Sequence, residues 1–220
     1  MINVLLNYYN FDGDWARPYL HNIFKSKPRV LIVPLAYRET QAWDNASFLS
    51  IYGKGGEKYD NILRPFLSYG YSEREITWLN PYDGSDHAEL VRNSDLLFFT
   101  GGMPEKAIAR MAELGIVGTV QAFKGTVMGA SAGAMLQLET YHVTPDEDYA
   151  QYGVWEGVGL VKGIDLEVHY LATALQNECT ARAASETGLP VYQMWHEGGL
   201  LIDNNRITLM GNVQTVYPSK

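Results

Sequence analysis

The stretch Thr126-Val127-Met128-Gly129-Ala130-Ser131-Ala132-Gly133-Ala134-Met135 decides the fold of this chain. Its first residues favour a strand and its last residues form an apolar run that can be helical, with one serine at the turn between them. Such a turn strains the backbone of the serine, so its neighbours must be small, and here they are Gly129, Ala130, Ala132 and Gly133. The sequence therefore predicts a strand, a sharp turn and a helix that hold the side chain of Ser131 clear of a sheet.

Outward from this unit, short segments rich in Val, Ile and Leu alternate with helix-length amphipathic stretches. This alternation is typical of an α/β fold with a mostly parallel sheet covered on both faces. Further strands are expected at residues 2–6, 29–34, 75–79, 96–100, near His169, and at 191–195. A hairpin is expected to pair residues 200–202 with 207–210, because Asp and Asn in the turn tolerate left-handed backbone. Helices are expected near residues 59–67, 104–113 and 174–187, and irregular loops at about 39–56 and 141–158.

Composition limits the domain count and the partners. The 220 residues are 46% hydrophobic, enough for one core, and we expect a single domain spanning residues 1–220. The net charge of -8 argues against nucleic acid and anionic membranes as partners. The single cysteine, Cys179, and the lack of an apolar run of about 18 residues favour the cytoplasm. The histidines lack the paired spacing of a zinc site, and we expect no metal and no cofactor.

Gly-x-Ser-x-Gly between a strand and a helix is the pattern of a nucleophile elbow, which makes Ser131 a candidate nucleophile. The helix behind it would supply free amides and partial positive charge where an oxyanion develops. A second glycine pair, Gly101-Gly102, follows the strand expected at 96–100. If the two strands are neighbours, this loop could turn one more amide toward the same oxygen.

A serine nucleophile needs a base. His21, His87 and His142 lie in stretches interpreted as surface helix or loop, which leaves His169 and His196. We favour His169, because it follows an alternating segment at a strand end where a side chain can project over the edge of the sheet.

The base in turn needs a carboxylate, and the residues leave two candidates open. Asp146 lies between serine and histidine, the chain order of α/β-hydrolases, although its acidic neighbours suggest a solvated loop. Glu197 follows the strand expected at 191–195 directly, where packing would hold it more rigidly.

With these residues in place, the chain resembles the serine peptidases of the peptidase E (aspartyl dipeptidase) and cyanophycinase family. The resemblance rests on residues 33–36 (Val-Pro-Leu-Ala), 100–102, 129–134, His169-Tyr170 and Glu197-Gly198. It implies a glutamine-amidotransferase-like, flavodoxin-like three-layer sandwich that hydrolyses a small peptide substrate. It also implies a triad of Ser131, His169 and Glu197, and oxyanion donors at the amides of Gly102 and Ala132.

Two departures from the family pattern argue against aspartyl selectivity. Met103 stands where aspartyl dipeptidases tend to carry Asn or Asp, and no Lys or Arg lies between Ser131 and Val161. A buried substrate carboxylate needs such a partner. The alternatives are an α/β-hydrolase-type esterase that uses Asp146, and a catalytically inactive homologue that binds small peptides.

Overall fold

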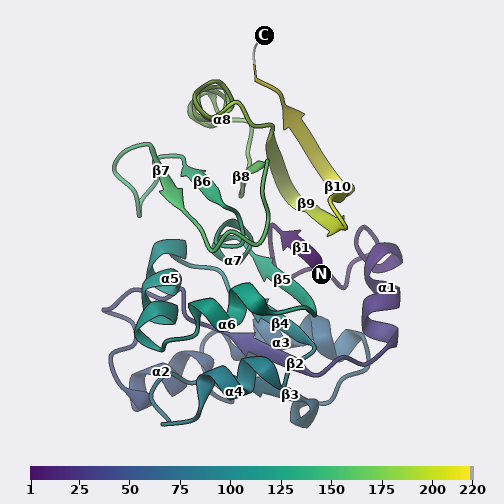
Figure 1. The fold of residues 1–220 in the computed structure, drawn as a ribbon, viewed down its shortest axis with the longest axis vertical. Helices are drawn as coiled ribbons and strands as arrows, with labels where there is room; N and C mark the ends of the chain where they lie inside the picture. The colour runs from purple at the N-terminus through teal and green to yellow at the C-terminus, as the bar shows by residue number, and fades with distance from the viewer. Residues whose placement is uncertain (219–220) are drawn as a thin grey trace.

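The main sheet of the protein has eight strands in the computed structural model, which describes residues 1–218. Its spatial order is β10-β9-β1-β5-β4-β2-β3, with β8 paired to β9 (Figure 1). The parallel part contains β1 (Ile2–Leu6), β5 (Thr126–Ala130), β4 (Leu96–Phe99), β2 (Val30–Val33) and β3 (Ile76–Trp78). The next strand, β9 (Val191–Asp203), runs antiparallel to β1. It pairs with β10 (Arg206–Val216) in antiparallel and with β8 (Asp165–Glu167) in parallel orientation.

Helices cover both faces of the parallel part, as Figure 1 shows. One face packs against α1 (Arg17–Lys25), α2 (Asn45–Tyr52) and α3 (Tyr59–Ser68). A 3₁₀ turn at Glu73–Glu75 follows α3 in the chain. The other face packs against α4 (His87–Arg92), α5 (Pro104–Glu113), α6 (Val117–Ala122) and the short α7 (Ala132–Met135). The last helix, α8 (Ala174–Thr187), packs on β8 and β9. The predicted three-layer α/β fold with a mostly parallel sheet is therefore confirmed.

The sequence explains why these elements form where they do. Strands β2 and β4 are buried along their whole length, since helices cover both their faces, and they contain only apolar residues. Helix α5 has Pro104 in its first turn, where the missing N–H costs nothing. Helix α8 begins at Thr173, whose side chain accepts the N–H of Gln176, and ends at Gly188 in a left-handed conformation. Both helices have the predicted bounds.

The two segments expected to be irregular contain regular structure. Helix α2 begins with a capping box, in which Asp44 and Ser47 each accept a backbone N–H from the other. In the second segment β6 (Thr140–Val143) pairs with β7 (Gly153–Glu156) as a separate two-stranded sheet. These helices and strands are short, so their local sequence signals are weak. The length of each segment therefore led to the expectation of an irregular loop.

Strand β9 is continuous, whereas the sequence suggested two strands separated by His196–Gly199. A Cβ on Gly198 would lie 2.6 Å from the carbonyl oxygen of Asn212, and one on Gly199 would lie 2.8 Å from that of Leu5. The glycines thus let β9 pass close to both neighbours, with a register shift opposite between Gly211 and Val213. Glu197 therefore lies inside β9 on its exposed side, and the expectation that it follows the end of a strand was wrong.

Among residues 1–218, none of the helices combines the length and the apolar composition that crossing a membrane requires.

Candidate active site

Ser131 lies at the turn between the carboxyl end of β5 and the start of α7, in a strained backbone conformation with φ 53° and ψ -121°. Its N–H donates to the carbonyl oxygen of Leu6 at 2.9 Å, which ties the turn to β1. A Cβ on Gly129 would lie 2.0 Å from the carbonyl oxygen of Gly133, and one on Gly133 would lie 2.1 Å from that of Phe99. Both glycines of the pattern are therefore required by the close approach of the backbone around the serine.

His169 meets Ser131 from the opposite direction. Strand β8 runs parallel to β9 and therefore antiparallel to β5, and His169 follows its end by two residues. The imidazole Nε2 lies 2.7 Å from the Ser131 Oγ, within hydrogen-bond distance. The structure thus brings together the two residues that the sequence singled out as nucleophile and base, from positions 38 residues apart.

The surroundings of His169 favour its neutral form. Burial lowers the pKa of its imidazole below the ordinary value of 6.5, and the negative charges of Glu167 and Asp146 act against this shift. At neutral pH a neutral imidazole can accept a proton from the hydroxyl that faces it.

Neither candidate carboxylate forms a hydrogen bond with this imidazole among the described residues. The Nδ1 of His169 is buried and has no hydrogen-bond partner within residues 1–218. Glu197 is exposed on β9 and makes no hydrogen bond with His169. Asp146 lines the cleft around Ser131, and its Oδ1 accepts the N–H groups of Asp148 and Tyr149.

The Gly101-Gly102 turn packs against Ser131. A Cβ on Gly101 would lie 3.3 Å from the Cβ of Ser131. Gly102 has φ 139°, and a Cβ there would lie 1.9 Å from the carbonyl oxygen of Ala36, so only glycine fits. Within the described residues, the N–H groups of Gly102 and Ala132 donate no hydrogen bond. Two free amides thus belong to the turns that flank the serine, as an oxyanion site requires.

Gly102, Ser131 and His169 line a cleft of about 530 Å³. The acidic loop that contains Asp146 lines it, together with the end of β8 and the start of α8. No Lys or Arg is among its lining residues. Arg38 reaches the loop from outside and pairs with Asp148, and the hydroxyl of Tyr149 donates to Glu105 at 2.7 Å.

A buried charged cluster adjoins the cleft, and the sequence reasoning missed it. His142 was interpreted as a surface residue, but it lies on β6 with 0% of its side chain exposed. Its Nδ1 lies 2.8 Å from a carboxylate oxygen of Asp165, and its Nε2 lies 2.8 Å from one of Glu167. The apolar neighbours Tyr141 and Val143 were the available signal, because they mark a buried strand.

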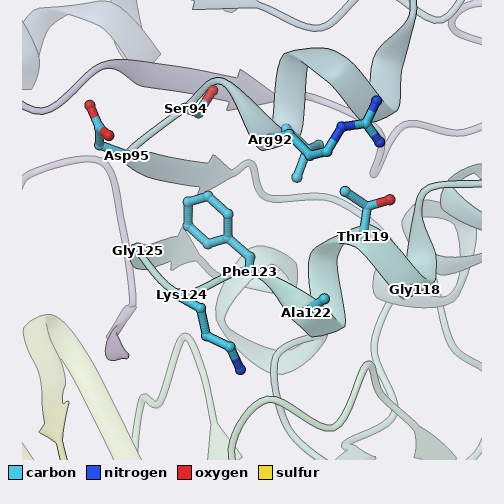
Figure 2. Close-up of a pocket in the computed structure, with 10 residues that line it drawn as sticks. Arg92, Ser94, Asp95, Gly118, Thr119, Ala122, Phe123, Lys124 and Gly125 are labelled. Atoms are coloured by element: carbon cyan, nitrogen blue, oxygen red, sulfur yellow. The ribbon is translucent and has the colours of Figure 1, made fainter.

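A second hollow of about 560 Å³ lies at the other end of the sheet, beside the amino ends of β4 and β5. Figure 2 shows the ring of Phe123 among its labelled residues, with the cationic side chains of Arg92 and Lys124 nearby. Its one serine, Ser94, donates to the carbonyl oxygen of Leu90 at 2.7 Å, and no histidine lines it. Of these two hollows, only the first therefore has a serine beside a histidine.

No group of three or more His, Cys, Asp or Glu in residues 1–218 is arranged to hold a metal ion. The imidazole of His142 uses both nitrogens on carboxylates, and that of His169 uses Nε2 on Ser131.

Comparisons with known proteins find the same fold in solved structures. A Listeria monocytogenes protein described as a candidate peptidase E superposes with a TM-score of 0.59 at 16% identity, covering 99% of this chain and 98% of that one. A peptidase from an acI-B1 actinobacterium superposes with a TM-score of 0.57 at 14% identity, covering 100% and 95%. No protein-family model matches the chain, and no curated protein does. The resemblance to peptidase E is thus confirmed at the level of the fold.

Proposed function

From the fold shared with these two structures, and from the serine hydroxyl 2.7 Å from an imidazole, we propose that this chain is a serine peptidase that hydrolyses short peptides. The contact between Ser131 and His169 carries the proposal. Two residues that follow different strands meet there in the lining of a cleft, and each has an unusual backbone with φ 53°. Strained backbone of this kind persists where the surrounding structure holds it, and it is frequent at active sites.

In the proposed reaction, Nε2 of His169 takes the hydroxyl proton while Oγ of Ser131 attacks the peptide carbonyl carbon. The oxygen that becomes negative is stabilised by the amides of Gly102 and Ala132. The C–N bond breaks as the imidazolium returns the proton to the leaving amine. Water then attacks the acyl-enzyme through the same base, releasing the acid and restoring the serine.

A direct test is reaction of the wild-type chain with a fluorophosphonate probe, followed by mass spectrometry of the labelled peptide. We expect one adduct, on Ser131. An adduct on another residue, or none at any probe concentration, would reject the assignment. Peptide binding without any acyl-probe reaction would instead support the inactive homologue.

The cleft also predicts substrate selectivity. A peptide with an aspartyl side chain would place its carboxylate near Asp146 and Glu167, with no Lys or Arg among the lining residues to pair with it. In a dipeptide library we therefore expect Asp-X peptides to be hydrolysed more slowly than peptides with a neutral first residue. A preference for Asp-X would show that a cation reaches the bound substrate from elsewhere. Fast ester hydrolysis without peptide hydrolysis would favour the esterase.

The carboxylate of the proposed triad is Glu197 or Asp146, and two variants separate them. The charge of Asp146 raises the pKa of His169, so Asp146→Asn should move the acidic limb of the rate profile to lower pH and reduce turnover about tenfold. Glu197→Gln should have the smaller effect, because the charges that act on His169 are those of Glu167 and Asp146 and not that of Glu197. A larger loss in Glu197→Gln, with an unshifted profile in Asp146→Asn, would assign the role to Glu197.

We also propose a cytoplasmic location. Cys179 is buried and unpaired among the described residues, as expected for a protein that keeps its thiol reduced. Recovery of the chain from an extracellular or periplasmic fraction would contradict this.

A further inference from the structure

The three residues that follow β1 contact both halves of the candidate site. Asn7, Tyr8 and Tyr9 begin directly after Leu6, whose carbonyl oxygen accepts the N–H of Ser131. The segment therefore leaves the sheet beside the nucleophile. None of its residues belongs to a motif that the sequence singled out.

Asn7 fixes the backbone of the base. Its side chain is fully buried, and its Oδ1 accepts the N–H of His169 at 2.7 Å. Its Nδ2 donates to the carbonyl oxygens of Met194 at 2.9 Å and Trp195 at 2.7 Å. Every hydrogen-bonding group of this amide thus has a partner, and the three bonds join β1, β9 and the segment after β8. A φ of 53° is uncommon for a residue other than glycine, and the bond to Asn7 helps to hold His169 in this conformation.

A second contact restrains the imidazole itself. The ring of Tyr8 lies 4.5 Å from the ring of His169, centroid to centroid, and 4.7 Å from that of His196. Since the Nδ1 of His169 has no partner in the described chain, the ring orientation rests on Tyr8 and on the bond to Ser131.

Tyr9 acts on the glycine turn. Its hydroxyl accepts the N–H of Gly101 at 2.5 Å, and burial raises its pKa to about 12, so it stays neutral. With the Gly101 amide taken up by Tyr9, the free amide of the turn is that of Gly102. The phenol thereby fixes which of the two glycine amides is left to face the substrate.

We propose that Asn7 and Tyr9 are positioning residues of this site: Asn7 holds the general base, and Tyr9 holds the turn that supplies an oxyanion donor. This proposal rests on the proposed function, because it assigns roles within the same reaction. Neither residue touches the reacting atoms, so both act through others. A misplacement of about 1 Å in such supports costs about a hundredfold in rate.

The test measures the rate constant for labelling of Ser131 by a fluorophosphonate, with melting temperature as a check on folding. Tyr9→Phe removes one hydroxyl and should slow labelling about tenfold, with the melting temperature kept. Tyr69→Phe is the matched control, because the Tyr69 hydroxyl also bonds a backbone group, the carbonyl oxygen of Phe11 at 2.9 Å, outside the cleft. It should label at the wild-type rate.

Asn7→Leu removes all three bonds and should slow labelling about a hundredfold, with loss of the pH dependence that comes from His169. Asn7→Asp keeps the acceptor for the His169 N–H but sets a buried carboxylate oxygen against the carbonyl oxygens of Met194 and Trp195, so it should recover only part of that rate. Equal rates in Tyr9→Phe and Tyr69→Phe, or a wild-type pH profile in Asn7→Leu, would overturn the proposal. If Asn7→Leu does not fold, the tyrosine pair decides alone. A wild-type chain that is not labelled at Ser131 would overturn the proposed function and this proposal together.

Discussion

A Ser131→Ala variant is expected to lose all reaction with a fluorophosphonate and about 10⁶-fold in peptide turnover. The change removes the oxygen that forms the acyl-enzyme in the proposed reaction, and alanine has the small Cβ that the turn already accepts. The Oγ of Ser131 bonds only to His169 within the described chain, so the melting temperature should stay close to that of the wild type. The measurements are probe labelling, turnover of the best library peptide, and thermal unfolding.

Two further variants serve as a control and a comparison for Ser131→Ala. Ser94→Ala removes a serine from the hollow at the opposite end of the sheet and should label and turn over like the wild type. His169→Gln should lose nearly as much turnover as Ser131→Ala, and the double variant no more than either, since the two groups act as a unit. Turnover that persists in Ser131→Ala but disappears in Ser94→Ala would move the active site to the other hollow.

A His142→Leu variant is expected to lose about 3–5 kcal/mol of unfolding free energy at neutral pH. Leucine leaves the carboxylates of Asp165 and Glu167, 1% and 5% exposed, without the cation between them. Adding Glu167→Gln to this variant should restore part of the stability, because it removes one of the two unpaired charges. Chemical denaturation of the single and double variants measures both values. A double variant less stable than His142→Leu would contradict a charged cluster.

The same cluster predicts how stability depends on pH. Burial alone would lower the pKa of His142, but the hydrogen bonds and charges of Asp165 and then Glu167 raise it to about 9. The folded chain therefore binds this proton more tightly than the unfolded chain, whose histidine has the ordinary pKa of 6.5. The stabilisation is complete below pH 6.5 and is lost as the pH rises through about 9. Wild-type unfolding free energy should fall over this range, and that of His142→Leu should fall less.

Local sequence signals predicted the parallel sheet and the contact between Ser131 and His169 at the carboxyl end of β5. Gly129 and Gly133 are dictated by the backbone around Ser131, because a Cβ at either position would lie about 2 Å from a carbonyl oxygen, so the pattern and the geometry have one cause. The bounds of α5 and α8 followed from Pro104 and Gly188, residues that act on their own backbone. Such signals survive in a sequence because they need no distant partner.

The missed features depend on distant partners. His142 looks like a surface residue until β6 is placed against β8, where two carboxylates meet its ring. Asn7 accepts the N–H of His169, which is 162 positions away, and the residues around Asn7 in the sequence give no signal of this hydrogen bond. Glu197 was misplaced for a similar reason, because the glycines after it signal a turn until β1 and β10 are seen to pass close by. Tertiary contacts overrode local preference in each case.

The place of β1 in the sheet has a consequence for biosynthesis. β1 is paired with β5 on one side and with β9 on the other, and β9 begins 60 residues after Ser131. A nascent chain therefore carries its serine before the histidine, and before the strand that closes the sheet around Asn7. The contact between the hydroxyl of Ser131 and the imidazole of His169 can therefore form only after β8 and the segment that follows it have been made, so the candidate site assembles late in synthesis.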